Sequence, residues 1–210
     1  MNELSIRATT GIAMIAVALA AVFIGGYAFA LLAAVVATAV FYEWTKLSKG
    51  WGAGWYVGGL AYALAAALSL LWIRDRSDNG IALVLWVFII VWSTDIGAYF
   101  TGRAIGGPKL APAISPGKTW AGFYGGIVAA TMLGGAWAYF EGLFPLSFLL
   151  APLFSVASQG GDLFESWMKR RAGVKDSGRW LPGHGGVFDR VDGLLPVAIL
   201  AANAMMAGML

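Results

Sequence analysis

The sequence predicts an all-α polytopic membrane protein with about seven transmembrane helices and with its functional loops on the cytoplasmic side. Hydrophobic residues make up 60% of the 210 residues and charged residues only 12%, whereas a soluble domain has about 45–50% apolar and about 25% charged residues. The mean hydropathy is +0.75, and the apolar residues form runs separated by short polar stretches. There is no cysteine, which excludes a disulfide framework and a cysteine-ligated zinc site.

The first part of the chain contains three apolar runs that predict membrane-spanning helices. Such a helix needs roughly 20 mainly apolar residues. Gly25 and Gly26 form a plausible tight connection between the first two runs. Trp55 and Trp72 lie near the ends of the third run, where aromatic side chains mark a membrane interface. The predicted spans are residues 8–23, 27–44 and 55–73.

The remainder of the chain predicts four more spans and two longer polar loops. The fourth span carries the carboxylate of Asp95 within an apolar segment. A polar loop, residues 101–119, precedes the fifth span, and a second polar stretch separates the sixth span from the seventh. No soluble domain and no internal repeat is evident. These spans are residues 80–100, 120–140, 146–161 and 191–206.

The distribution of positive charge predicts the orientation. With the N-terminus in the cytoplasm and seven spans, twelve of the fourteen Lys and Arg residues fall on the cytoplasmic side. Only Arg74 and Arg76 fall on the outer side. Cytoplasmic loops carry an excess of Lys and Arg, so this arrangement is favoured, and it places both polar loops on the nucleotide-containing side.

The polar stretch 166–192 is where a binding site is expected. It contains six cations, three aspartates and the only histidine of the chain, His184, which stands among glycines. Cations, carboxylates and glycines at the ends of hydrophobic segments indicate a site for a phosphate-rich ligand and a metal. The cations are Lys169, Arg170, Arg171, Lys175, Arg179 and Arg190, and the aspartates are Asp176, Asp189 and Asp192.

Three carboxylates are the best metal candidates: Asp162, Asp189 and Asp192. Mg²⁺ prefers carboxylate oxygens, waters and substrate phosphates. Asp189 and Asp192 are three residues apart and would share one face at a helix start. The alternative is that all three are solvated caps, because Asp is favoured near helix N-termini.

The cations of the same stretch could pair with phosphates, with Arg as a bidentate fork and Lys as a point charge. The alternative is a basic cluster beside the membrane that sets topology and contacts anionic headgroups. His184 could donate to a phosphate or take part in proton transfer, or could make only a structural hydrogen bond in a tight loop.

Two upstream features are also candidates. An ionisable group such as Asp95 inside a span is costly and indicates function by default, although a position at the helix end is the alternative. Ser115, Lys118 and Thr119 precede the fifth span and could contact phosphates at a helix N-terminus, with an N-cap and turn as the alternative. A P-loop is rejected because the earlier glycine is absent at the required spacing.

The stretch resembles the signature of the CdsA-type phosphatidate cytidylyltransferases, or CDP-diacylglycerol synthases. The family pattern is Ser-x-apolar-Lys-Arg, four residues, Lys-Asp, then apolar-Pro-x-His-Gly-Gly-apolar-x-Asp-Arg-apolar-Asp, and residues 166–192 match it without departure. Residues 95–103, 115–122 and 161–165 resemble further family segments. The resemblance covers about the C-terminal 60% of the chain, while the N-terminal spans match only in hydrophobic character.

The resemblance implies that CTP and phosphatidate react to give CDP-diacylglycerol and pyrophosphate. It implies that Asp162, Asp189 and Asp192 hold Mg²⁺, with one or two cations and the second of unknown identity. Catalytic roles are also expected for His184 and Lys175. The residues expected to bind substrate are Asp95, Ser115, Lys118, Thr119, Lys169, Arg170, Asp176 and Arg190.

We therefore expect one integral membrane domain, 1–210, with scaffold helices in 1–80 and catalytic helices and loops in 81–210. The expected location is a bacterial inner membrane. The expected partners are CTP, phosphatidate and the bilayer, with a homodimer as a further assembly and no nucleic acid. A transporter or channel with an intramembrane Asp, or an enzyme that uses another lipid acceptor, remains the alternative.

Overall fold

The structure is a computed structural model that describes residues 3–76, 78–143 and 146–210. It is built mainly of helices, and every apolar run predicted above lies wholly or largely within one of them. The long helices are α1 (Glu3–Ile24), α2 (Gly26–Leu47), α3 (Ala53–Arg74), α4 (Gly80–Ile105), α5 (Trp120–Phe140), α6 (Leu146–Arg171) and α8 (Leu194–Met206). A single turn, α7 (Phe188–Val191), precedes α8.

Within the described residues, four helices are long and apolar enough to cross a membrane: α1 from Ser5, α2, α3 and α4. Helix α6 has 26 residues but carries charges in its last turns. Helix α8 is apolar but has only 13 residues, fewer than the roughly 17–25 of a typical span. The chain is thus an integral membrane protein with at least these four candidate spans.

Two segments differ from the sequence-based expectation. Helix α6 does not end at Gly161 but continues to Arg171, so its last ten residues are helical and contain all of its charged side chains. The loop expected at 101–119 contains an antiparallel hairpin of β1 (Lys109–Ala111) and β2 (Ser115–Thr119), in which Lys109 pairs with Thr119 and Ala111 with Ser115. Side chains of both segments, which were expected to lie in polar loops, are therefore held by regular secondary structure.

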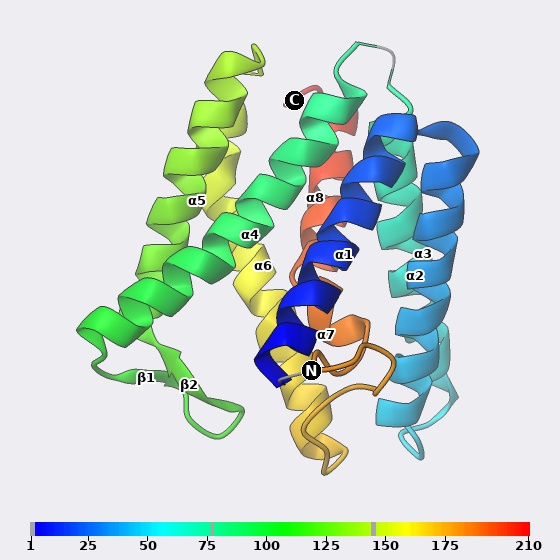
Figure 1. Cartoon of the computed structure of the whole chain (residues 1–210), viewed down its shortest axis with the longest axis vertical. Coiled ribbons are helices and arrows are strands. Elements are labelled where there is room, and N and C mark those ends of the chain that lie inside the picture. Colours follow the sequence, from blue (N-terminus) through cyan, green and yellow to red (C-terminus); the bar gives the residue numbers. More distant parts are fainter. Residues whose placement is uncertain (1–2, 77, 144–145) are drawn as a thin grey trace.

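The polar segments gather at one end of the molecule. Figure 1 shows the hairpin, the C-terminal end of α6, the 172–187 loop, α7 and the start of α1 all at the lower end of the helices. The C-terminus of the chain and the far end of α5 lie at the opposite end. Segments that are far apart in the sequence are therefore brought together at a single polar end.

Close packing fixes this arrangement. Helix α4 lies against α5 through small residues, since a Cβ at Gly97 would lie 2.8 Å from the carbonyl oxygen of Gly125. A cluster of buried side chains from α2, α3, α6, α7 and α8 lies under the polar end, with Trp44, Met168 and Phe188 among its fully or nearly fully buried members. This cluster supports the turn α7 and the last turns of α6.

Candidate active site

One face of α6 supplies the first set of polar side chains. Asp162, Glu165, Ser166 and Lys169 are spaced by three or four residues, so they lie on the same side of the helix. The hydroxyl of Ser166 donates to the carboxylate of Asp162 over 3.3 Å. The extension of α6 beyond Gly161 is what creates this polar face.

Lys169 joins that face to α7. Its ammonium donates to Oδ1 of Asp189 over 2.6 Å and also contacts the fully buried carboxylate of Glu165. Asp189 lies in the single turn of α7 and is itself largely buried. A cation between two buried carboxylates holds the end of α6 against α7.

The other oxygen of Asp189 organises the polar loop. Oδ2 accepts hydrogen bonds from the Ser177 amide at 2.9 Å, the Ser177 hydroxyl at 3.0 Å and the Gly186 amide at 2.8 Å. All of these donors come from the same chain segment, residues 177–186, which the carboxylate folds around itself.

A carboxylate from the N-terminal half completes this arrangement. Glu43 of α2 is fully buried, and it accepts from the Ser177 hydroxyl at 2.8 Å, the Phe188 amide at 2.8 Å and the Val187 amide at 3.0 Å. The two amides begin α7, so Glu43 satisfies donors that a helix start leaves unpaired. We call Glu43, Ser177, Asp189 and the amides of 186–188 the loop anchor.

The glycines of the signature make room for these carboxylates. A Cβ at Gly186 would overlap the Ser177 hydroxyl and the Glu43 carboxylate. Gly185 has φ +80°, a conformation that L side chains rarely adopt, and a Cβ there would lie 2.8 Å from Oδ2 of Asp189. At these two positions glycine admits the chain's own acidic groups, whereas the sequence suggested a close approach of ligand.

The two carboxyl groups that contact Lys169 differ in their charge. Burial opposes the ionisation of Asp189, but hydrogen bonds with Glu165, Lys169 and the Gly186 amide outweigh burial and lower the pKa of Asp189 to about 2. Burial, together with the hydrogen bond to Asp189, raises the pKa of Glu165 to about 9. Near neutral pH, Asp189 is therefore charged and paired with Lys169, while Glu165 keeps its proton.

A second set of acids behaves differently. Lys118 of β2 reaches Oδ2 of Asp162 at 2.7 Å, and Asp192 accepts one hydrogen bond, from the Gly193 amide at 2.7 Å. Burial raises the pKa of Asp192 well above its ordinary value, and the charges of Asp162 and Asp95 act in the same direction. We call Asp95, Asp162 and Asp192 the three-carboxylate group.

Some of the other predicted site residues form hydrogen bonds within the protein, and others have side chains without a partner among the described residues. Thr119 caps α5 by accepting from the Gly122 amide at 3.0 Å, as the N-cap alternative predicted. Arg170 donates to the carbonyl of Ile114 at 3.1 Å and ties α6 to the hairpin, while Ser115 lies opposite Ala111 in the hairpin.

His184 lies in the tight turn of the polar loop. Its Nδ1 is 3.4 Å from the Pro182 carbonyl oxygen, and its own carbonyl accepts from Arg190 at 3.1 Å. Lys175 and Asp176 are exposed, and in the part of the chain that the structure describes their side chains make no hydrogen bond or ion pair. These two remain available to a ligand.

The donor chemistry fits a hard divalent cation at the three-carboxylate group. Asp162 and Asp192 retain unused oxygen acceptors, and the like charges there would be relieved by a cation. Asp189 would accept a metal only if Lys169 withdrew from it. Over the described ranges, no three His, Cys, Asp or Glu side chains are already arranged to hold a metal ion.

Sequence reasoning missed two parts of the site. Glu43 was absorbed into an apolar span and was given no role, although a lone carboxylate near the end of such a span is itself a signal. Ser177 lies inside the signature but outside its defined positions. The hydrogen bonds between them join residues 134 positions apart, which no local pattern reveals.

Comparisons with known proteins identify relatives of this chain. A model of the cytidylyltransferase family matches residues 49–207. A protein named phosphatidate cytidylyltransferase from Brucella suis is 40% identical over 257 aligned residues, covering 95% of this chain and 92% of the relative. Proteins with the same name from Pseudomonas aeruginosa and Haemophilus influenzae are 41% and 47% identical over 75% and 55% of this chain, and over 60% and 43% of their own lengths.

Proposed function

The chain belongs to the cytidylyltransferase family, and we propose that it makes CDP-diacylglycerol and pyrophosphate from CTP and phosphatidate at the polar end of its helices. The observation that carries this proposal is that acids and cations from β2, α4, α6 and α7 converge there, beside helices that are apolar enough to lie in a bilayer. A water-soluble nucleotide and a lipid headgroup can meet only at such a boundary.

The reaction joins two anions. A phosphate oxygen of phosphatidate forms a bond to the α-phosphorus of CTP, and the bond from that phosphorus to the bridging oxygen of the β-phosphate breaks, so pyrophosphate leaves with the electron pair. Charge neutralisation and in-line positioning supply most of the rate enhancement in such transfers.

Some of the cationic side chains that could neutralise phosphate charge are already paired with acids, and others are not. Lys118 and Lys169 are already paired with acids, whereas Lys175 is exposed and unpaired within the described residues. We assign Lys175 and Arg190 to the phosphates of CTP, and Lys118 and Arg170 to the edge of the site near the hairpin. Asp176 and His184 lie on the same loop as Lys175, and we assign them to contacts with the nucleotide.

Magnesium is the cation that we assign to this site, held by Asp162 and Asp192 and, after Lys169 withdraws, by Asp189. When bound it would neutralise phosphate oxygens and help pyrophosphate to leave. A second cation of unknown identity is part of the proposal. Asp95, the member of the three-carboxylate group on α4, adds negative charge that favours cation binding.

The membrane arrangement is proposed at finer detail than four spans. We infer that α5, the apolar part of α6 up to Gly161, and α8 also lie in the membrane, which makes seven segments. The N-terminus and the polar end then face the cytoplasm of a bacterial inner membrane, where CTP is present. A homodimer is the assembly that we propose for the membrane-embedded protein.

The test uses purified protein in detergent–phosphatidate micelles with labelled CTP and Mg²⁺. Labelled CDP-diacylglycerol is expected, and it should vanish with a chelator and return with excess Mg²⁺. Asp162→Asn should lower product formation by about 10²–10³-fold, while Glu141→Gln, at an exposed carboxylate just after α5, should leave it unchanged. A folded sample that binds CTP but forms no product would overturn phosphatidate as the acceptor.

A further inference from the structure

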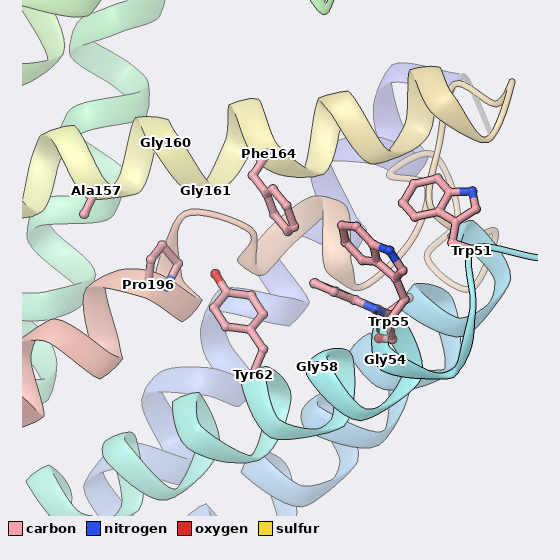
Figure 2. A pocket seen from close by; sticks show the side chains of 11 residues that line it. Trp51, Gly54, Trp55, Gly58, Tyr62, Ala157, Gly160, Gly161, Phe164 and Pro196 are labelled. Atoms are coloured by element: carbon pink, nitrogen blue, oxygen red, sulfur yellow. Dashed lines mark hydrogen bonds between the residues drawn. The ribbon is translucent and has the colours of Figure 1, made fainter. Parts of the chain in front are cut away.

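An apolar cavity of about 730 Å³ lies between α3, α6 and α8, next to the three-carboxylate group. Figure 2 shows the rings of Trp51, Trp55 and Phe164 along one part of the cavity, and Tyr62 and Pro196 along the other. This volume lies within the roughly 300–1,000 Å³ of small-molecule sites, which are mostly apolar with a few polar groups.

Glycines on two helices keep this space open. Gly54 and Gly58 of α3 and Gly160 of α6 all line the cavity. A Cβ added at any of the three would meet no atom within 4 Å. Glycine in a helix interior costs about 1 kcal/mol relative to alanine, and packing against a neighbouring helix does not account for these three, unlike Gly97.

The cavity adjoins the proposed reaction site. Gly161 lines the cavity and directly precedes Asp162, and the space of its missing Cβ is filled by the carbonyl of Asp192. The hydroxyl of Tyr62 points toward Pro196 of α8 in Figure 2 and makes no hydrogen bond within the described residues. One end of the cavity is thus polar and adjoins the acids, and the rest is apolar.

We propose that this cavity binds one acyl chain of the diacyl phospholipid substrate, with the Tyr62 hydroxyl contacting the ester region between the chain and the phosphate. This inference rests on the function proposed above. The walls come from α3, a candidate span, so the cavity is reached from the lipid phase. Its connection to Asp192 is what a chain attached to a reacting headgroup requires.

A cytosine ring is the other ligand that aromatic walls could suit, by stacking. Recognition of a base needs both donors and acceptors for its polar edge, whereas the described side chains of the cavity offer the Tyr62 hydroxyl and the indole N–H donors of Trp51 and Trp55. The indole N–H of Trp44, another wall residue, already donates to the Trp55 carbonyl at 2.8 Å. The polar groups suited to the nucleotide lie instead on the 172–187 loop, so the acyl chain is the better fit.

The test fills the cavity without disturbing the acids. Gly58→Phe places a ring in the open space, and Ala61→Phe adds the same ring one turn along α3 at an exposed position that does not line the cavity. Gly58→Phe should raise KM for a phosphatidate with two 18-carbon chains by about tenfold, the scale on which apolar pockets discriminate. KM for CTP and for a phosphatidate with two six-carbon chains should stay within twofold, and Ala61→Phe should change none of them.

A second measurement does not depend on the folding of a variant. Wild-type protein is irradiated with a phosphatidate that carries a diazirine near the end of one acyl chain, and the labelled peptides are identified. Labelling of residues 54–62 and 157–164 is expected, with competition by unlabelled long-chain phosphatidate. Labelling elsewhere on the helices would overturn the assignment.

The two proposals fail in different ways. Absence of CDP-diacylglycerol from wild-type protein with either lipid would overturn the proposed function. Normal turnover by the wild type, combined with equal effects of Gly58→Phe on long and short lipids, would overturn the acyl-chain site alone. An increase in KM for CTP alone would assign the cavity to the base.

Discussion

Two groups of acids at the same end of the molecule differ in how completely the protein satisfies them. In the loop anchor, Glu43 and Asp189 together accept seven hydrogen bonds, from Ser177, from the amides of residues 186–188 and from Lys169. In the three-carboxylate group, Asp162 has one Lys and one Ser partner, and Asp192 has one amide. The first group has little left to offer a ligand, and the second has much.

This difference indicates that one group of acids supports the structure and that the other is suited to binding a ligand. A carboxylate that is saturated by its own chain holds a loop in place, because losing it leaves several buried donors unpaired. A carboxylate with free acceptors beside other negative charges is suited to bind a cation. Neighbouring aspartates such as Asp189 and Asp192 can therefore have different tasks.

The largest effect is expected when a buried, paired lysine and an exposed, unpaired one are each replaced. Lys169→Ala leaves buried Asp189 without its cation, which should lower the free energy of unfolding by about 3–5 kcal/mol. Lys175→Ala removes an exposed side chain and should leave stability unchanged. Thermal unfolding in detergent measures both, and equal stability of the two variants would show that the Lys169–Asp189 pair does not stabilise the fold.

The next effect separates the two groups by stability, at an equal loss of activity. Asp162→Asn and Asp189→Asn should each lower kcat by about 10²–10³-fold, the scale of losing one group that stabilises developing charge. Only Asp189→Asn should also lower the melting temperature, since its carboxylate holds the 177–186 segment. The measurement pairs product formation with unfolding of the same samples, and a melting temperature lowered by Asp162→Asn alone would reverse the assignment.

A smaller loss is expected at the residue that the sequence did not single out. Glu43→Gln replaces an acceptor of three hydrogen bonds by a group with one acceptor and an extra donor, which should cost about 1–3 kcal/mol of unfolding free energy. The 172–187 loop should become more sensitive to protease before global unfolding. Glu141→Gln serves as the matched control, and an unchanged loop in Glu43→Gln would contradict its role.

The last expected effect is a pH dependence. Because the pKa of Glu165 is raised to about 9, the folded state binds a proton that the unfolded state releases above pH about 4.3. The associated stability is present below that pH and is lost progressively as pH rises toward 9. Melting temperatures at pH 6 and pH 9 should therefore differ less in Glu165→Gln than in the wild type, and equal differences would contradict the raised pKa.

Much of the fold could be predicted because apolar run length has a direct physical meaning in a membrane. The ends of α6 and the hairpin could not. Gly160 and Gly161 seemed to end α6, although the three- and four-residue spacing of Asp162, Ser166 and Lys169 continues the helical period. In β2, Pro116 and Gly117 are both disfavoured in strands, so pairing with β1 overrides local preference.

For the candidate site, the sequence indicated which polar residues to consider but not how they are arranged. It pointed to Asp162, Asp189 and Asp192, but a pattern of residue types does not say which acid faces which donor. That choice depends on Glu43, which meets residues 177–188 only after the helices have packed. Long-range hydrogen bonds of this kind carry no mark in the local sequence.

The hydrogen bond between Glu43 and the Phe188 amide also constrains when the site can fold during synthesis. These residues are 145 positions apart, and at about 5–20 residues per second of synthesis roughly 7–29 s pass before the second appears. During that time the carboxylate of α2 has no partner from the later segment. Glu43 lies one turn before the end of α2 at Leu47, where water can hydrate its carboxylate until the later segment is synthesised. The loop anchor can form only after residues 177–188 have been added to the chain.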